Sequence, residues 1–154
     1  MEIRRANIND IAILNKLLAQ VNLIHHNGRP DLFKVANKYT DDELKSIIAD
    51  ESRPIIVAVD GGEVVGYAFC VFKQYVDNHL LTDIKSLFID DLCVDESKRG
   101  RHIGETIYNA VLDLAKESGA YNVTLNVWNF NSGALKFYES LGLTPLKTTM
   151  EMII

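Results

Sequence analysis

The chain has 154 residues, of which 47% are hydrophobic and 24% are charged, and its formal net charge at pH 7 is −5. This length predicts one domain over residues 1–154, and the globular composition argues against disorder. The acidic balance argues against a general nucleic-acid binder, whose surface is basic. There is no signal-peptide pattern and no apolar stretch long enough to span a membrane. We therefore expect a cytoplasmic protein without nucleic-acid or membrane partners, in which Cys70 and Cys93 are reduced and buried.

The first half of the chain predicts a strand, two helices and a hairpin. The expected elements are a strand at 2–6, a helix from 9 or 10 to 18, a loop at 25–39, a helix from 40 to about 50, and a hairpin around 60–62. Thr40 and Glu43 form a capping-box pattern, which marks a helix start. The turn Asp60-Gly61-Gly62 lies between two β-rich runs, as in a tight hairpin.

The second half alternates strands and helices. The expected elements are strands at 86–94, 121–128 and 147–154, and helices from 103 to a glycine cap at 119 and from 131 to about 141. Ile103, Ile107, Val111 and Leu114 form one apolar stripe. The element order predicts an α/β (α+β) domain, with a mixed, mostly antiparallel sheet and helices on both faces.

A basic cluster precedes the helix that begins near residue 103. Lys98, Arg99 and Arg101 lie where the helix dipole is already positive, so each cation there costs about 0.3–1 kcal/mol. A turn bracketed by Gly100 and Gly104 presents free N–H groups to the solvent and binds phosphate readily. A bound anion would explain the cluster. The alternative is a solvated basic turn whose glycines only reverse the chain.

Two motifs here resemble those of the GNAT superfamily of N-acetyltransferases. Arg99-x-x-His102-x-Gly104, after a strand ending at Val94, resembles the family's acyl-CoA loop. The stretch "NFNSGALKFYESLGL" resembles its second motif, with matches at Asn131, Ala134, Phe137, Tyr138 and Gly142. His102 replaces a glycine of the usual loop, so its backbone needs a negative φ or a tolerated left-handed conformation. The element order is also similar, so the resemblance covers nearly the whole chain.

The resemblance implies acetyl-CoA as cosubstrate, with its pyrophosphate on the turn from Arg99 to Gly104, and no metal. It also implies a sheet with splayed central strands, and a backbone N–H near Leu92 or Val94 that polarises the acetyl carbonyl. Attack would be direct, in a ternary complex, and Tyr138 would protonate the departing thiolate. The residues expected to bind acetyl-CoA are Leu92, Cys93, Val94, Arg99, Gly100, Arg101, His102, Ile103, Gly104 and Asn131.

Two adjacent acids interrupt the apolar run from Ser86 to Val94. On a regular strand Asp90 and Asp91 point to opposite faces, so only one reaches the acceptor directly. That acid would take the proton of an ammonium acceptor, and we favour Asp90. The alternative is an ion pair with a Lys or Arg that only holds the structure. The stretch "DDLCV" resembles the polyamine-acetylating branch of the family.

The acceptor implied by the resemblance is a primary amine of a small molecule, with a polyamine-like amine as one candidate; a peptide or protein amine is the alternative. In this fold the first helices and their loop line the acceptor pocket, which points to His26, Phe33, Tyr39 and, on the terminal strand, Glu151. We allow for a homodimer. A CoA-binding sensor is the non-enzymatic alternative, disfavoured by Tyr138 and the acid pair. The histidines fit no metal-site spacing, and no dinucleotide-binding fingerprint is present.

Overall fold

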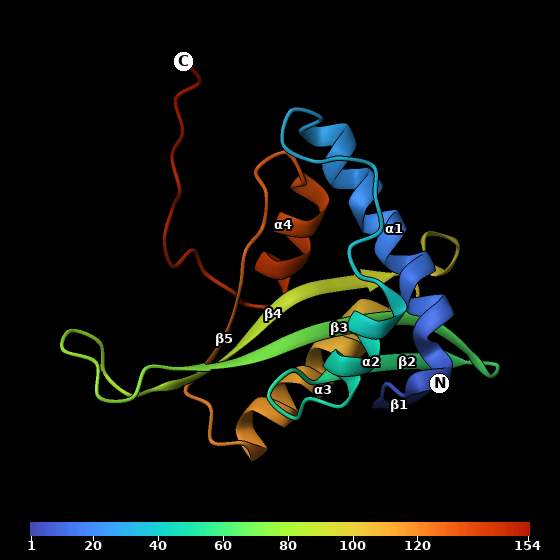
Figure 1. Cartoon of the computed structure of the whole chain (residues 1–154), viewed down its shortest axis with the longest axis horizontal. Coiled ribbons are helices and arrows are strands. Elements are labelled where there is room, and N and C mark those ends of the chain that lie inside the picture. Colours follow the sequence, from blue (N-terminus) through green and yellow to red (C-terminus); the bar gives the residue numbers. More distant parts are fainter.

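Five strands form one sheet, and the computed structural model describes all residues, 1–154 (Figure 1). The strands are β1 (Glu2–Arg5), β2 (Ile55–Asp60), β3 (Glu63–Gln74), β4 (Lys85–Val94) and β5 (Asn122–Leu125). They lie side by side in sequence order. Neighbours are antiparallel except β4 and β5, which run parallel. The predicted mixed, mostly antiparallel sheet is confirmed.

Helices cover both faces of the sheet. They are α1 (Ile11–Gly28), α2 (Asp41–Ile48), α3 (Ile103–Glu117) and α4 (Ser132–Ser140), with single 3-10 turns at Ile8–Asp10 and Glu96–Lys98. None of these helices has the length and apolarity needed to cross a membrane.

The alternation of side chains along β2 divides the core in two. Val57 and Val59 belong to the cluster under α1 and α2, whereas Ile56 and Ala58 belong to the cluster under α3. Burying one such aliphatic side chain contributes about 1.5–3 kcal/mol, so both layers hold the sheet between them.

Several local signals act as the sequence predicts. The Thr40 hydroxyl accepts from the Glu43 N–H and the Glu43 carboxylate accepts from the Thr40 N–H, which completes the capping box at α2. Gly61 and Gly62 have φ angles of +60° and +85° in the β2–β3 turn, and Gly119 has φ of +70° just after α3. Glycine adopts these left-handed conformations without the steric cost of a Cβ atom.

The parallel pair β4 and β5 separates after four residues. Pairing covers Ser86–Ile89 against Asn122–Leu125, and β4 then continues to Val94 without β5 beside it. Figure 1 shows the resulting opening, with α4 on one side and α1 on the other. The expected splay of the central strands is therefore present, and it opens that edge of β4 from Asp90 onward.

α1 is longer than the sequence predicts. It passes Leu18 and ends only at Gly28, so His25 and His26 belong to its last turn and not to a loop. The physical reason is that Val21 extends the apolar face onto the same core cluster. The Asn27-Gly28 pair ends this helix instead of forming an isolated turn.

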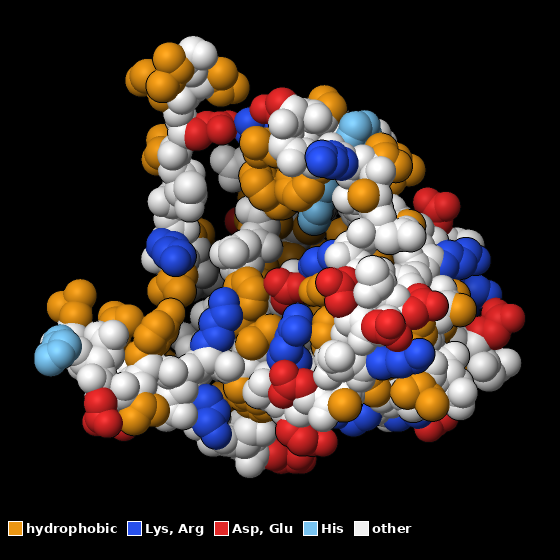
Figure 2. Space-filling view, in the orientation of Figure 1, with side chains coloured by type: hydrophobic (Ala, Val, Ile, Leu, Met, Phe, Trp, Pro, Cys, Tyr) orange, Lys and Arg blue, Asp and Glu red, His pale blue; other side chains and the backbone are white.

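The expected terminal strand at 147–154 is wrong for this structure. The segment after Leu143 has no regular structure and extends away from the body (Figure 1). Figure 2 shows most of this tail standing apart from the body, with hydrophobic side chains at its end; Glu151 connects it to the body through a salt bridge with Arg29, next to the end of α1. A strand needs a neighbouring edge for its backbone hydrogen bonds, and the tail runs beside none. β5 likewise ends at Leu125 instead of Trp128.

Candidate active site

The turn before α3 presents a run of free backbone N–H groups. Gly100 and His102 have φ angles of +78° and +57°, so two left-handed residues curl the chain ahead of the helix. The Thr106 N–H donates to the His102 carbonyl (3.0 Å), but the N–H groups from Gly100 to Glu105 donate to no protein acceptor. Consecutive free amides at a helix N-terminus form a cradle for anions such as phosphate.

His102 takes the second of its two expected conformations, the left-handed one. This region costs a residue with a Cβ roughly 1–2 kcal/mol. Its side chain is exposed, and Nδ1 lies 3.1 Å from Glu105 Oε2. The ring leaves the amides of the turn uncovered, because it forms no cap on the helix.

Two of the three cations in the basic cluster have partners in the protein. Arg101 forms a salt bridge to Asp60 at the β2–β3 turn (3.0 Å), and Arg99 Nε donates to the Val94 carbonyl (3.4 Å). Lys98 forms no salt bridge. The cluster is thus tied to the sheet on both sides, which fixes the turn in place.

Gly104 has a packing role that the sequence did not reveal. A Cβ at this position would lie 3.1 Å from Phe137 Cζ, so the first turn of α3 touches α4. A side chain here would disturb the contact between the two helices as well as the turn.

A β-bulge at Asp90 overturns the expected facing of the two acids. Phe69 of β3 pairs with Asp91, but the next residue, Cys70, pairs with Ile89, so Asp90 is the extra residue. Bulges re-aim side chains in this way. The expectation that Asp90 and Asp91 face opposite sides is therefore wrong: one lysine reaches both carboxylates.

That lysine is Lys38, from the loop between α1 and α2. Its Nζ lies 2.9 Å from Asp90 Oδ2 and 3.6 Å from Asp91 Oδ2. Burial lowers the pKa of Lys38, but the attraction of Asp91 and Asp90 outweighs it and raises the pKa overall. The ion pair with a Lys or Arg, which was the alternative to a catalytic role for these acids, is thus present, and it involves both of them.

The two acids differ in burial. The Asp91 side chain is 9% exposed and that of Asp90 is 35% exposed. Burial raises the pKa of Asp91 to about 6, against the opposing effect of Lys38. A carboxyl group with such a pKa can accept a proton near neutral pH and release it again. Asp91 therefore fits the role of base better than the favoured Asp90.

Tyr138 lies on α4, with its ring centroid 5.2 Å from that of Phe137. Burial raises the pKa of its hydroxyl far above the ordinary value, and the charge of Asp91 raises it further. The hydroxyl consequently keeps its proton at neutral pH and lies within electrostatic reach of Asp91. Such a group is suited to donating a proton.

Two of the expected acetyl-CoA contacts also have other roles. Asn131 caps α4, because its Oδ1 accepts from the Ala134 N–H (3.2 Å). Cys93 is buried beside α1, where its Sγ lies 3.8 Å from the Leu17 carbonyl, and burial raises its thiol pKa to about 12. Cys93 is thus a packing residue and a poor nucleophile. With Leu92 and Val94 it lies on the part of β4 that β5 does not cover.

The four acceptor candidates fall into two places. The Tyr39 ring stacks on Phe69 at 5.9 Å, and its hydroxyl is 3.5 Å from Asp90, so Tyr39 adjoins the acids. Burial raises its pKa. His26 and Phe33 lie at the far end of α1, where His26 Nδ1 is 2.6 Å from the Phe33 carbonyl. His26 therefore holds the loop.

Around Phe33 lies an aromatic cluster. Its members are His25, Phe33, Trp128 and Phe130, with Phe33 5.0 Å from His25 and 5.3 Å from Trp128 between ring centroids. Gly28 permits this contact, because a Cβ there would lie 2.3 Å from the Phe130 ring. The cluster joins the end of α1 to the segment just before α4.

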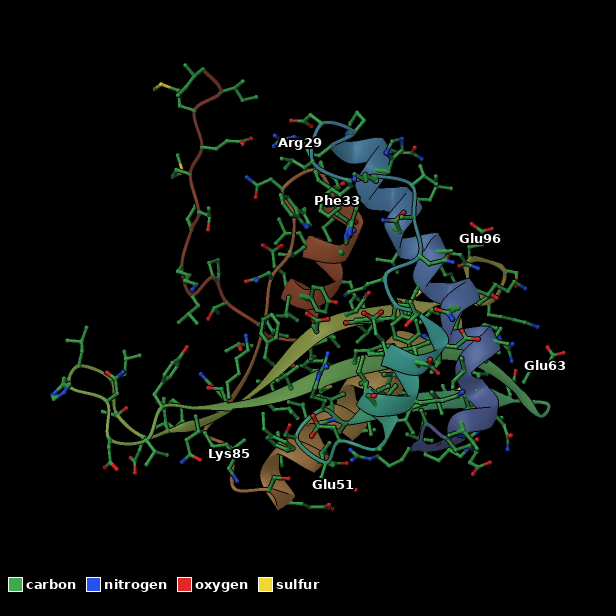
Figure 3. All side chains as sticks on the ribbon, in the orientation of Figure 1. Arg29, Phe33, Glu51, Glu63, Lys85 and Glu96 are labelled. Carbon is green, nitrogen blue, oxygen red and sulfur yellow. The ribbon has the colours of Figure 1, made fainter.

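Glu151 lies on the tail and not on a strand of the sheet. It forms a salt bridge with Arg29, which also binds Asp31. Figure 3 shows Arg29 and Phe33 together at the end of α1. Glu151 thus lies near His26 and Phe33 and apart from the Asp90–Asp91 pair.

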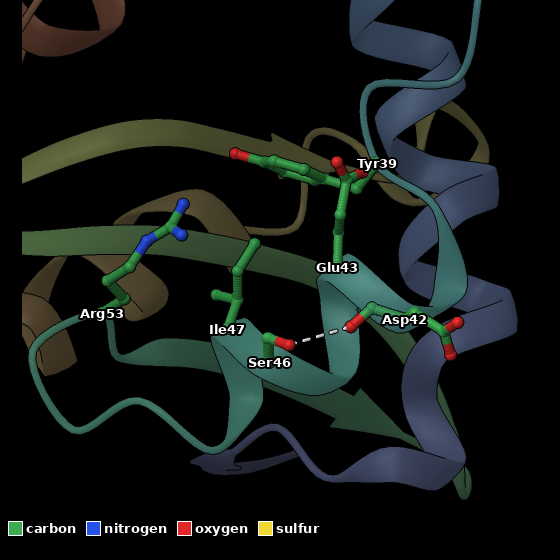
Figure 4. A pocket seen from close by; sticks show the side chains of 6 residues that line it. All are labelled: Tyr39, Asp42, Glu43, Ser46, Ile47 and Arg53. Carbon is green, nitrogen blue, oxygen red and sulfur yellow. Dashed lines mark hydrogen bonds between the residues drawn. The ribbon is translucent and has the colours of Figure 1, made fainter.

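A shallow pocket of about 360 Å³ opens beside Tyr39 on the α2 side (Figure 4). It is lined by Tyr39, Asp42, Glu43, Ser46, Ile47 and Arg53. The Ser46 hydroxyl donates to the Asp42 carbonyl (3.1 Å), and the Glu43 carboxylate is engaged in the capping box. The pocket is thus a surface groove along α2, separate from Tyr138.

Lys38 is the contact of the two acids that the sequence did not reveal. It lies in a loop without helical or strand pattern, more than fifty positions before the acids it contacts. No short-range signal marks such a contact. No group of three or more His, Cys, Asp and Glu side chains is placed to hold a metal ion.

A model of the acetyltransferase (GNAT) family matches residues 21–143. The chain belongs to this family. The match includes the turn before α3, the Asp90–Asp91 pair and Tyr138. A solved structure of a tetramutant of the BH1408 protein from Bacillus halodurans has a TM-score of 0.95 and 31% identity, with all of both chains covered.

Two curated relatives of this GNAT chain act on different acceptors, to judge by their names. Streptothricin acetyltransferase of Streptomyces lavendulae is 29% identical over 60% of this chain and 44% of its own length. N-alpha-acetyltransferase 30 of Schizosaccharomyces pombe is 33% identical over 59% of this chain and 57% of its own length. The chain therefore spans about half the length of these relatives.

Proposed function

We propose that the protein transfers an acetyl group from acetyl-CoA to a primary amine, by direct attack in a ternary complex. The observation that carries this proposal is the combination of Asp91, at the bulge of β4 beyond its pairing with β5, and the buried Tyr138 hydroxyl on α4, which the charge of Asp91 influences. One has a pKa near neutrality and the other keeps its proton. Acyl transfer to an ammonium needs one proton removed from the nitrogen and one delivered to the leaving sulfur.

The turn from Gly100 to Glu105 supplies the groups that would hold a pyrophosphate. Its free amides can donate to phosphate oxygens, and the nearby Arg99 and Lys98 add positive charge. Acetyl-CoA brings the activated thioester. The chain itself binds and orients this cosubstrate through the turn, with Arg101 anchored to Asp60.

In the proposed reaction Asp91 takes a proton from the acceptor ammonium, which frees the nitrogen lone pair for attack on the thioester carbonyl. Tyr138 then donates its hydroxyl proton to the sulfur as the carbon–sulfur bond breaks. Asp90, which is more exposed, would bind the cationic acceptor through charge. No covalent enzyme intermediate is needed, in agreement with the buried, protonated thiol of Cys93.

For the acceptor we propose a small cationic amine, with a polyamine-like compound as one candidate. Two carboxylates at the base site favour a cation, and the small-molecule acceptor in the name of the streptothricin relative supports this class. A peptide or protein amine is the second candidate, because the Schizosaccharomyces pombe relative is named as an N-alpha-acetyltransferase. Tyr39 adjoins the acids and would line this site, whereas His26, Phe33 and Glu151 would contact only a longer acceptor.

We also propose that the protein forms a homodimer in the cytoplasm. Exposed apolar side chains are concentrated on the tail and on the β3–β4 loop, and include Leu146, Met150, Met152, Ile153, Val76, Leu80 and Leu81. Both segments project from the same side of the molecule (Figure 1). A second copy is the partner that would cover both, and two buried unpaired cysteines suit a reducing compartment.

The test measures turnover of acetyl-CoA through the free thiol that is released. The amines offered are polyamines, amine antibiotics and peptides. We expect release with at least one small cationic amine. Binding of CoA without turnover of any amine would replace the proposal with the sensor alternative. Turnover of peptides alone would reassign the acceptor class.

A further inference from the structure

A primary amine of the protein itself occupies the proposed acceptor site. The Lys38 ammonium lies against both carboxylates that we assign to the acceptor, 2.9 Å from Asp90 and 3.6 Å from Asp91. Chemically, this ammonium is what the enzyme needs to receive: a primary amine, protonated, bound to its own base. The Tyr39 ring adds a cation–π contact, with Lys38 Nζ 5.5 Å from the ring centroid.

The backbone of the loop that carries Lys38 is held by few hydrogen bonds, and the stacking of Tyr39 on Phe69 anchors the loop beside the acids. Within residues 34–39 the backbone N–H groups donate one inter-residue bond, from Ala36 to Asn22 Oδ1 (3.1 Å). The Lys38 side chain is 37% exposed, so its amine is accessible from the opening and not sealed in the core. Lys34, on the same loop, makes no salt bridge and serves as an internal comparison.

We propose that the enzyme acetylates its own Lys38 when no external acceptor is present. Asp91 accepts one proton from the Lys38 ammonium, and the nitrogen lone pair attacks the thioester carbonyl. The carbon–nitrogen bond forms, the carbon–sulfur bond breaks, and the thiolate takes the Tyr138 proton. The products are Nε-acetyl-Lys38 and CoA; the second ammonium proton, lost as the amide forms, restores the Tyr138 hydroxyl, and the proton on Asp91 passes to solvent. This inference rests on the proposed function, since it uses the same base and acid.

Acetylation would change the acceptor site in a defined way. Nε-acetyl-Lys38 carries no charge, so it no longer bridges Asp90 and Asp91. The two carboxylates would then be free for a cationic acceptor. Lys38 is thus both the first acceptor and the group that an external amine must displace.

The test is mass spectrometry of the purified full chain after incubation with isotope-labelled acetyl-CoA and no other amine. We expect one labelled acetyl group per chain at Lys38. Trypsin would then fail to cleave after Lys38 and would release one peptide covering residues 35–45. Lys34 should remain unlabelled over the same time. Lys38→Arg, which keeps the charge but is not an acetyl acceptor here, should abolish the label.

Tyr138→Phe separates enzymatic from chemical acetylation, because it should slow labelling of Lys38 at least tenfold and leave slow labelling of other lysines unchanged. Equal labelling of Lys34 and Lys38, or labelling unaffected by Tyr138→Phe, would overturn the inference. An unlabelled Lys38 in a protein that turns over an amine from the panel would overturn it and leave the proposed function standing. No label and no turnover would overturn both.

Discussion

In the proposed mechanism, the complementary roles of Asp91 and Tyr138 have one physical cause, which is burial. Burial disfavours the charged form of each group, so both pKa values rise. For a carboxyl group the rise brings the pKa to about 6, close to neutral pH. For a phenol the same rise moves the pKa further from neutrality and keeps the proton in place. Burial therefore suits Asp91 to the proposed role of base and Tyr138 to the proposed role of acid.

Asp91→Asn should remove the acidic limb of the pH profile of kcat/KM. In the wild type, kcat/KM should fall as pH drops below about 6, because protonated Asp91 no longer accepts a proton. Without this base the reaction depends on acceptor that is already deprotonated, which is scarce until pH approaches an amine pKa of about 10. The variant should therefore lose about 10²-fold in kcat/KM near pH 7 and recover as pH rises.

Asp90→Asn is the matched control for this measurement. It should raise KM for a cationic acceptor and keep the wild-type shape of the pH profile. If Asp90→Asn abolishes the acidic limb and Asp91→Asn keeps it, the two roles are exchanged. If both variants keep the limb, neither acid is the base.

Tyr138→Phe deletes only the hydroxyl and keeps the ring on Phe137. If the hydroxyl protonates the leaving thiolate, kcat should fall by about 10²–10⁴-fold. The affinity for acetyl-CoA, measured by calorimetry, should change little. An unchanged kcat in single-turnover experiments would make Tyr138 a packing residue.

Among the helices and strands, those that can be predicted from the sequence are the ones whose own side-chain pattern determines their structure. The alternation along β2 and the stripe on α3 need only a core to bury against, and Thr40 with Glu43 needs only its own backbone. The bulge at Asp90 is different, because it depends on how β3 pairs with β4. No local pattern encodes that register.

The candidate site shows the same division. The turn before α3 and Tyr138 lie in continuous motifs, so the sequence reveals them. The contact of Lys38 with the acids depends on the path of a loop without periodic pattern. The tail is an intermediate case: Thr148, Met150 and Met152 alternate with polar residues as in a strand, but a strand pattern does not specify which edge it joins.

The turn before α3 allows a test of its strained residue. His102→Gly relieves the left-handed strain, at some cost in unfolded-state entropy, so the free energy of unfolding should stay equal or rise by up to about 1 kcal/mol. CoA affinity should be kept, because the amides of the turn are unchanged. His102→Val, with a β-branched side chain, should destabilise by about 1–2 kcal/mol and weaken CoA binding. Urea unfolding and calorimetry measure both effects, and weaker CoA binding by His102→Gly would count against the role of the turn.

At the scale of the molecule, substitutions in the tail test the proposed dimer. Met150→Asp replaces an exposed apolar side chain of the tail with a charge, whereas Thr149→Asp introduces the same charge at the neighbouring polar position. Light scattering should show that Met150→Asp lowers the molecular mass toward that of one chain. Thr149→Asp should leave the mass at two chains. A wild-type mass of one chain at all concentrations would refute the dimer.

The close approach at Gly28 couples the end of α1 to the segment before α4. With its Cβ position 2.3 Å from the Phe130 ring, the end of α1 has no space to move toward the segment that leads through Asn131 into α4. We expect a displacement of the end of α1 toward this segment to push on the start of α4, the helix that carries Tyr138. Gly28→Ala should lower kcat by forcing this movement in the free enzyme. Adding Phe130→Ala should restore part of the loss, as a double-mutant cycle would show. The residue at position 28 would then limit how closely the end of α1 can approach Phe130.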